Sequence, residues 1–389
     1  MTESGTAPTI DRVTARRLAV RAALLDGPPL PARTESVVSV ARHFGGIQID
    51  PTRTVERTQH LVLWSRLRTY DRALLDRVLA DRKLFEWNAF IVPVDRLPEL
   101  LHYGKTWPNG GGNWRQRARD FIAGNAEFRQ SILDQLRAEG PLQSRQIDDS
   151  KVKVGWVSTG WTHGKNSSQM LEFMSVKMDV VVAGRVGQER LWDLAERVIP
   201  ADAPRNELTD DEYAEWRVMR GVERFGVATL AEIRARAYGM SVPEVGATLA
   251  RLSEQGKVEE VKLELPTGTV EAFVPSGALA RLADDSRPWT TLVSPFDPFI
   301  YDRERTERLF DFSYKLEMYV PKGQRKFGHF VLPIVHDHAL IGRLDSNRDR
   351  KTNELVINKV HWEGATPKAA ARAAVDQAID DLAEFVRTG

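Results

Sequence analysis

The clearest pattern of apolar and polar positions lies in the middle of the chain. Apolar residues at helical spacing, followed by two β-rich runs, predict helices over 212–225, 230–238 and 242–255, then strands over 258–265 and 269–274. Gly256 stands where a glycine commonly ends a helix. Pro266-Thr267-Gly268 is short enough to be the turn of a β-hairpin. Because helices followed by a tight hairpin are the order of a winged helix, we interpret this segment as one.

A second copy of the module is predicted upstream. It consists of helices over 128–139 and 168–178 and strands over 179–185 and 189–194. A glycine-rich insertion, 151–166, separates the two helices and carries Trp156 and Trp161.

The first 120 residues are interpreted as a third, more degenerate copy. Helices are expected over 14–25 and 36–44, and Gly45-Gly46 ends the second one. A short extended segment, 47–50, follows, and the run 59–67 is expected to return as its partner strand.

From Trp289 onward the pattern changes to short β-rich runs separated by turn signals. We expect strands over 291–294, 316–320, 329–335, 339–344 and 355–362, followed by a helix over 367–387. Several short strands at this spacing indicate a small barrel or curled sheet. The strand 316–320 and the run 327–333 are predicted to form a hairpin with 321–326 at its tip.

These elements predict an α+β protein with four domains. Three tandem winged helices would occupy 9–120, 121–204 and 205–284, and a small β-barrel with a C-terminal helix would occupy 285–389. Winged helices place a helix in a DNA groove, although some of them serve as protein-interaction modules. Tandem copies therefore favour double-stranded DNA as the partner.

Composition and charge exclude several other classes. The 389 residues include 55 Lys and Arg against 54 Asp and Glu, so the net charge of +1 gives no global attraction to a nucleic acid or a membrane. The charge is segregated, however, because arginines crowd one early helix and 204–215 is acidic. The absence of cysteine excludes disulfide scaffolds, thiolate zinc sites and cysteine nucleophiles. With no leader-like N-terminus and no apolar run of about 18 residues, we expect a cytoplasmic protein.

The most unusual segment is Gly45-Gly46-Ile47-Gln48-Ile49-Asp50-Pro51. In an extended chain, Ile47 and Ile49 would face the core, while Gln48 and Asp50 would share the opposite face with Cα atoms about 6.5–7 Å apart. An amide and a carboxylate at that separation can hold one water molecule between them. Alternatively, Asp50 only opens the turn at Pro51 and Gln48 is a solvated strand residue.

Four phrases carry a resemblance to a known family. They are HFGGIQIDP, QHLVLWSRL, LWDLAERVIP and SPFDPFIYDRERTERLFDFSYKLEMYVPKGQRKFGHFVLPIV. Together they resemble the YcaQ family of bacterial DNA glycosylases, which includes AlkZ-type and AlkX-type enzymes, over about 14–363. The resemblance implies three winged helices and a β-barrel arranged in a C shape around a DNA channel. It also implies a catalytic Gln-x-Gln or Gln-x-Asp motif, of which Gln48 and Asp50 are the second, AlkX-type form.

The resemblance implies a monofunctional glycosylase that excises N7-alkylated purines, unhooks interstrand crosslinks and leaves an abasic site. Asp50 would stabilise the cationic sugar and polarise the attacking water, and Gln48 would orient that water. No metal or cofactor is implied. The partner would be double-stranded DNA with alkylated bases or crosslinks, bound by a monomer on the nucleoid. The competing interpretation is a winged-helix transcriptional regulator without catalysis.

Other candidate residues have two interpretations each. At the tip 321–326, the polar side chains suit phosphate or minor-groove contact, or form a solvated basic turn; they are Lys322, Gln324, Arg325 and Lys326. Trp156 and Trp161 either contact DNA or pack in a core. His336-Asp337-His338 resembles a metal cluster but is typical of a polar hairpin turn, and Asp297 is typical of a turn cap.

Overall fold

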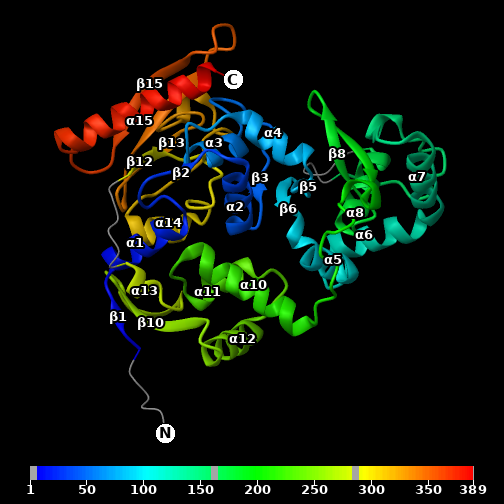
Figure 1. Cartoon of the computed structure of the whole chain (residues 1–389), viewed down its shortest axis with the longest axis horizontal. Coiled ribbons are helices and arrows are strands. Elements are labelled where there is room, and N and C mark those ends of the chain that lie inside the picture. Colours follow the sequence, from blue (N-terminus) through cyan, green and yellow to red (C-terminus); the bar gives the residue numbers. More distant parts are fainter. Residues whose placement is uncertain (1–6, 159–164, 283–288, 389) are drawn as a thin grey trace. The chain divides into compact units, whose positions relative to one another are not determined.

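The computed structural model describes residues 7–158, 165–282 and 289–388 and is an α+β protein (Figure 1). The chain divides into two compact units. Unit 1 comprises Met1–Phe44, Gln48–Leu75 and Asp210–Gly389, and unit 2 comprises Gly45–Ile47 and Asp76–Thr209. In the described part of the chain, no helix is both long and apolar enough to cross a membrane.

The predicted module in the middle of the chain is present in unit 1, element by element. Its helices and strands are α10 (Asp210–Phe225), α11 (Leu230–Arg236), α12 (Val242–Glu254), β10 (Val258–Leu265) and β11 (Gly268–Pro275). Local capping explains where two of the helices begin. Thr229 and Glu232 form a capping box on α11, and Ser241 and Glu244 form one on α12. Gly256 has a φ of +67°, the left-handed conformation that ends α12.

The hairpin β10–β11 is antiparallel from Val258↔Pro275 to Leu265↔Gly268. The short strand β1 (Thr9–Ile10) adds to it in parallel through β10. Apolar residues that alternate along β10 belong to two cores, since Val258 packs with the helices α10 to α12, whereas Val261 and Leu263 pack under α1 (Arg12–Ala22). A short helix, α13 (Ala278–Arg281), follows the hairpin.

The N-terminal part of unit 1 is more helical than expected. Its elements are α1, β2 (Leu30–Pro31), α2 (Thr34–Phe44), α3 (Thr58–Trp64), β4 (Leu67–Arg68) and the beginning of α4 (Arg72–Ala80). The prediction of a strand over 59–67 is wrong, because most of this run is α3. Its three consecutive apolar residues, Leu61, Val62 and Leu63, are all buried. A short run that is apolar on every side fits a buried helix as well as a buried strand, and periodicity alone does not separate the two.

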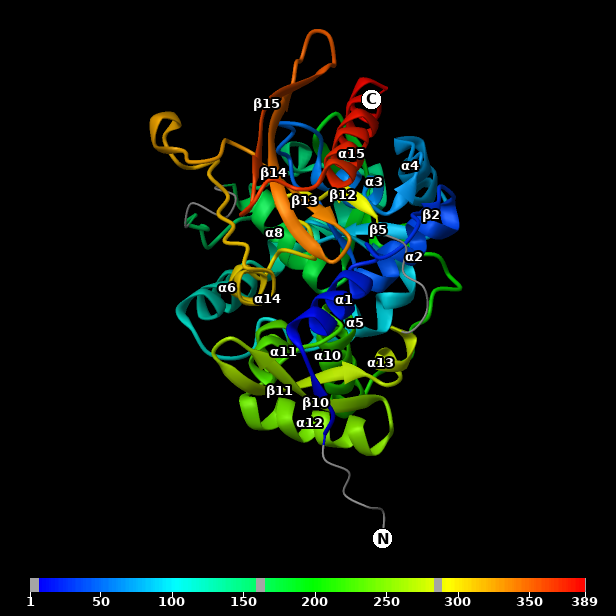
Figure 2. The same cartoon turned by 90° about the vertical axis from the view of Figure 1, so that its left-hand side faces the viewer.

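The C-terminal part of unit 1 is an open, four-stranded antiparallel sheet. Its order is β12 (Thr290–Leu292), β13 (Leu332–His336), β14 (Ala339–Arg348) and β15 (Leu355–Trp362). Helix α15 (Ala369–Arg387) packs on this sheet through Val375, Ile379 and Leu382 (Figure 2). The expected barrel is therefore wrong, since none of the sheets formed by described residues closes into one.

The segment between β12 and β13 explains why the sheet stays open. It contains α14 (Arg303–Phe310) and a single 3-10 turn, η3 (Lys322–Gln324), and the predicted hairpin over 316–333 does not form. The Glu317 carboxylate accepts hydrogen bonds from the backbone N–H groups of Lys326, Phe327 and Gly328, at 2.9–3.1 Å. These N–H groups are thus satisfied by a side chain instead of a partner strand. The long hairpin of this sheet is β14–β15.

Unit 2 surrounds a second sheet, with the strand order β6-β5-β8-β9-β7 and Ile47 of β3 (Ile47–Gln48) next to β6. The strands are β5 (Leu84–Trp87), β6 (Phe90–Pro93), β7 (Leu142–Gln143), β8 (Val180–Val186) and β9 (Glu189–Leu194). The α-helices are α5 (Leu97–Thr106), α6 (Asn113–Gly124), α7 (Ala126–Glu139), α8 (Asn166–Val176) and α9 (Ala195–Val198), with 3-10 turns η1 (Val94–Arg96) and η2 (Ser144–Gln146). The predicted helices and strands of the second module are present among them.

Candidate active site

The Gln48–Asp50 motif is only partly extended. Strand β3 ends at Gln48, and Asp50 lies in the loop that follows. Ile47 is fully buried, as the alternation predicts, but Ile49 is only partly buried. Gln48 and Asp50 are both partly exposed in unit 1. The strand pattern therefore holds for Ile47 and Gln48 and stops there.

Asp50 is held by one backbone contact. Its Oδ1 accepts a hydrogen bond from the Thr52 N–H at 2.8 Å, which is the turn at Pro51 that the simpler interpretation predicts. Among the described residues, neither the second oxygen of Asp50 nor the amide of Gln48 has a hydrogen-bond or ion-pair partner. Both side chains can therefore still bind water or a substrate.

Buried Glu56 holds the loop that carries Asp50. It is 1% exposed and receives hydrogen bonds from Arg53, from the Arg57 N–H and from Arg72, at 2.6–3.0 Å. Burial by itself would raise the pKa of Glu56, but the Arg53 and Arg57 hydrogen bonds and the charge of Arg72 lower it to about 2. Glu56 is thus a carboxylate at neutral pH and fixes the loop between Asp50 and α3.

Strand β14 fixes the same loop from another direction. The Arg348 N–H donates to the Thr54 carbonyl at 2.7 Å, and the Thr54 hydroxyl lies 3.4 Å from Nδ1 of His329. Burial and the charge of Arg325 lower the pKa of His329, so its ring is neutral at pH 7. Asp50 therefore sits on a loop that is tied at Thr54 and Glu56.

Gly328 makes the approach of His329 to this region possible. A Cβ at position 328 would lie 2.3 Å from a carboxylate oxygen of Asp345, and φ is +145°. Any larger residue would therefore push the Asp345 carboxylate away. Burial raises the pKa of Asp345, and a side-chain hydrogen bond with Asn358 opposes that shift.

The predicted DNA-contacting residues of the barrel hairpin lie on an irregular turn. Lys322, Gln324 and Lys326 are exposed, and Arg325 is partly exposed with its Nε donating to the Val320 carbonyl at 2.8 Å. The three cations thus occupy the surface of unit 1 without the hairpin that was expected to present them. Their contact with DNA stays a prediction.

Trp156 is a core residue of unit 2. It is 6% exposed and packs edge-on against Phe121 and Phe173, with ring centroids 5.4 and 5.2 Å apart, and the Arg117 guanidinium lies over its ring. A base has no access to a ring in that position, so of the two interpretations core packing is correct. Trp161 lies outside the described residues.

The carboxylates near Pro298 have structural roles. Asp297 is completely buried and forms a two-pronged ion pair with Arg66, which is also inaccessible. It caps the Phe299 N–H as well, at 2.9 Å, and Asp302 caps α14. His336-Asp337-His338 turns between β13 and β14, as predicted. The described residues contain no cluster of three His, Asp or Glu side chains suited to a metal.

Sequence reasoning missed a group of arginines on α10. Its signal is the spacing of Tyr213, Arg217, Arg220 and Arg224, which places all four on one face of a helix. Burial and the charges of Arg236 and Arg220 lower the pKa of Arg224 to about 9, and they outweigh weaker effects that raise it. An arginine shifted this far is unusual and marks the group as a second candidate site.

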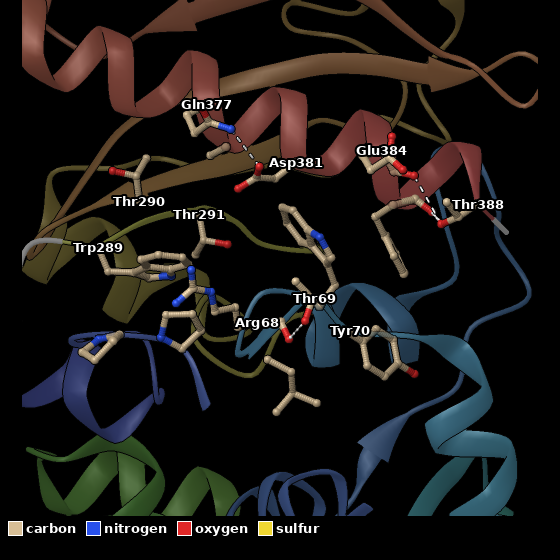
Figure 3. Close-up of a pocket in the computed structure, with 16 residues that line it drawn as sticks. Arg68, Thr69, Tyr70, Trp289, Thr290, Thr291, Gln377, Asp381, Glu384 and Thr388 are labelled. Carbon is tan, nitrogen blue, oxygen red and sulfur yellow. Dashed lines mark hydrogen bonds between the residues drawn. The ribbon is translucent and has the colours of Figure 1, made fainter. Parts of the chain in front are cut away.

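Unit 1 also contains a cavity of about 730 Å³ between α15, β12 and the end of α3 (Figure 3). Four aromatic rings contribute to its wall, and the Gln377 amide donates to Asp381 at 2.9 Å along α15. The rings are Trp64, Tyr70, Trp289 and Phe385. Neither Gln48 nor Asp50 lines it, so the cavity is separate from the candidate catalytic motif.

Comparison with known proteins identifies one family. The model of the AlkZ-like DNA glycosylases matches residues 41–385. Among solved structures, the DNA glycosylase AlkZ of Streptomyces sahachiroi has a similar fold, with a TM-score of 0.64 over 97% of both chains at 16% sequence identity. The matched segment includes Gln48 and Asp50 and most of both units.

Proposed function

Because the chain belongs to the AlkZ-like DNA glycosylase family, we propose that it hydrolyses the N-glycosidic bond of N7-alkylated purines in double-stranded DNA and leaves an abasic site. The family membership makes the protein a DNA repair enzyme that acts on DNA. The lesion is the proposed part, and it includes purines joined in an interstrand crosslink. A regulator without catalysis does not fit this family.

The chemistry of this lesion does not require a general acid in the active site to protonate the leaving base. An N7-alkylated purine is already cationic, so it leaves without being protonated. Its departure gives the sugar oxocarbenium character, as in other glycosidic cleavages. A fixed carboxylate stabilises that charge where it develops, and it also accepts a proton from the attacking water.

The observation that supports this mechanism best is the state of Asp50. One of its oxygens is fixed by Thr52, and the other has no partner among the described residues. The loop that carries it is tied down through Glu56 and Thr54. In this proposal, Asp50 stabilises the sugar cation and activates water, and Gln48 orients that water through its amide.

We further propose that the predicted modules 9–120, 121–204 and 205–284 act as winged helices on duplex DNA. Within the 285–389 region, the surface cations Lys322, Arg325 and Lys326, with Gln324, would add phosphate contacts. The protein would act as a monomer on the nucleoid.

The test uses duplex DNA with a single N7-methylguanine, and a second duplex with a nitrogen-mustard crosslink. Single-turnover excision is measured as strand cleavage after alkali. Asp50→Asn is expected to lower the rate by about 100-fold or more, because the carboxylate charge acts on the transition state. Its affinity for the duplex should not fall.

Asp71→Asn is the matched control. Asp71 makes the same kind of turn, accepting from the Ala73 N–H at 2.9 Å, in the same unit. It should excise at the wild-type rate. Full activity of Asp50→Asn would refute the assignment of Asp50, and failure of the wild type on both duplexes would refute the proposed lesions.

A further inference from the structure

One face of α10 carries a stripe of arginines that the proposed mechanism does not use. Arg217, Arg220 and Arg224 follow Tyr213 at intervals of three and four residues, so they project from the same side of the helix. Arg236, at the end of α11, joins them from the neighbouring helix, since its charge acts on Arg224. All of these residues belong to unit 1.

Two of these arginines donate to backbone carbonyls. Arg217 donates to the Tyr238 carbonyl at 2.7 Å, and Arg220 donates to the Arg42 carbonyl at 3.0 Å. Within the described part of the chain, Arg224 and Arg236 have no hydrogen-bond or ion-pair partner. The Nε atoms of Arg217, Arg224 and Arg236 are buried and unpaired. Guanidinium groups held in this way retain several unused donors.

Among the described residues, no carboxylate forms an ion pair with Arg224 or Arg236. The acidic group that acts most on Arg224 is Asp297, but both of its oxygens already bind Arg66. Arg224 remains protonated at neutral pH with a pKa of about 9, lowered first by burial and then by the charges of Arg236 and Arg220. Bringing like charges together in a partly buried place costs stability, and an external anion would remove that cost.

The stripe lies next to the helix that leads into the catalytic motif. Arg220 binds the carbonyl of Arg42, which is near the end of α2 and six residues before Gln48. The group also reaches the surface, because the Arg236 guanidinium stacks 4.3 Å from the ring centroid of Tyr301, which is 45% exposed. An anion can therefore approach the group from solvent.

We propose that Arg224 and Arg236, flanked by Arg217, bind a phosphodiester group of the duplex beside the catalytic motif. The inference rests on the proposed function, in that the protein acts on double-stranded DNA. A phosphate offers several acceptor oxygens to the guanidinium groups of Arg224 and Arg236, which have no hydrogen-bond or ion-pair partner in the described part of the chain. Its charge also offsets the repulsion between them. The stripe would thus hold the DNA backbone while Asp50 acts on the sugar.

The experiment measures binding of an undamaged duplex by fluorescence anisotropy between 50 and 200 mM salt, with Arg224→Gln, Arg236→Gln and the double variant. We expect each single variant to weaken binding, and the double variant to reduce the slope of log K against log salt by about one, which is the contribution of one phosphate. Arg234→Gln is the control, because Arg234 is exposed on the same short helix and its loss removes the same charge.

Stability separates this role from a structural one. Removing an unpaired, partly buried charge should leave the unfolding midpoint of the free protein unchanged or raise it, whereas a structural arginine would lower it. A slope equal to that of Arg234→Gln would overturn the proposal. A site that binds only free anions would also overturn it. In that case, inorganic phosphate at constant ionic strength would stabilise the wild type but not the double variant, and the two proteins would bind DNA equally well.

The outcome is independent of the proposed lesion. Undamaged duplex is used, so failure to excise N7-methylguanine leaves the binding result unaffected. A protein that excises the lesion normally but shows no change of slope in the variants would refute the phosphate site alone.

Discussion

Arg66 and Arg224 are both at least partly buried in unit 1, but they differ in whether a carboxylate pairs with them. Arg66 is fully inaccessible, and it donates to both oxygens of Asp297 and to the carbonyl of Ala23. Arg224 is partly buried beside Arg220 and Arg236, and among the described residues no carboxylate pairs with it. A cation that the protein itself neutralises serves the fold, whereas a cation left without a counter-charge is available to an external anion.

The largest effect on stability is expected at the ion pair of Arg66 and Asp297. Asp297→Asn leaves Arg66 as a buried charge without its partner, and breaking such a pair typically costs about 3–5 kcal/mol. The free energy of unfolding, from urea denaturation, should fall by this order. A change below about 1 kcal/mol would mean that Arg66 finds enough compensation in backbone carbonyls, and the contrast with Arg224 would lose its basis.

Glu56 gives an intermediate case, because one carboxylate serves several arginines. Its pKa is lowered to about 2 in the folded state from an ordinary value of 4.5. The stability that it contributes is therefore fully present above about pH 5 and is lost as the pH falls toward 2. Between pH 6 and pH 3, this one group should account for a loss of about 2 kcal/mol.

The measurement compares unfolding of the wild type and of Glu56→Gln as a function of pH. The variant should be less stable at pH 6, and the difference should shrink as the pH falls to 3. A difference that is constant with pH would show that Glu56 acts through its shape and hydrogen bonds and not through its charge.

The smallest effect is expected at the surface. Asp311 is 64% exposed and pairs with Arg12 and Arg16 at 2.7 and 2.8 Å. Exposed pairs of this kind contribute about 0–1 kcal/mol. Asp311→Asn is a suitable variant, because Asn tolerates the left-handed φ of +54° at this position. Its unfolding free energy should fall by less than about 1 kcal/mol, and a loss as large as that of Asp297→Asn would remove the distinction between buried and exposed pairs.

The sequence predicted much of the local structure because short-range signals were strong there. The helices and hairpin from α10 to β11 carry capping boxes, a terminal glycine and a tight turn, and all of them formed as expected. The run 59–67 was misread because three consecutive apolar residues fit a helix or a strand equally well. The hairpin over 316–333 was misread because its strand-like residues are held by Glu317, a contact that no periodicity reveals.

Part of the candidate site could also be predicted from the sequence, and part could not. Gln48 and Asp50 were found from their spacing and from a family resemblance, both of which are properties of neighbouring residues. For Trp156, the sequence fitted a core residue and a DNA-contacting residue equally well. Its packing against Phe121 and Phe173 in the structure decided between these two interpretations.

The sequence by itself determined where most helices and strands begin and end, which family the motif resembles, and that no thiol takes part in the chemistry. Only the tertiary structure decided which charges are neutralised. Arg66 and Asp297 are 231 residues apart in the chain, yet burial brings them together. Arg224 lies on a helix of ordinary amphipathic pattern, and the elements packed around it place no carboxylate of the described residues in an ion pair with it. Burial and pairing depend on contacts between distant segments, and the spacing of residues along one helix does not specify them.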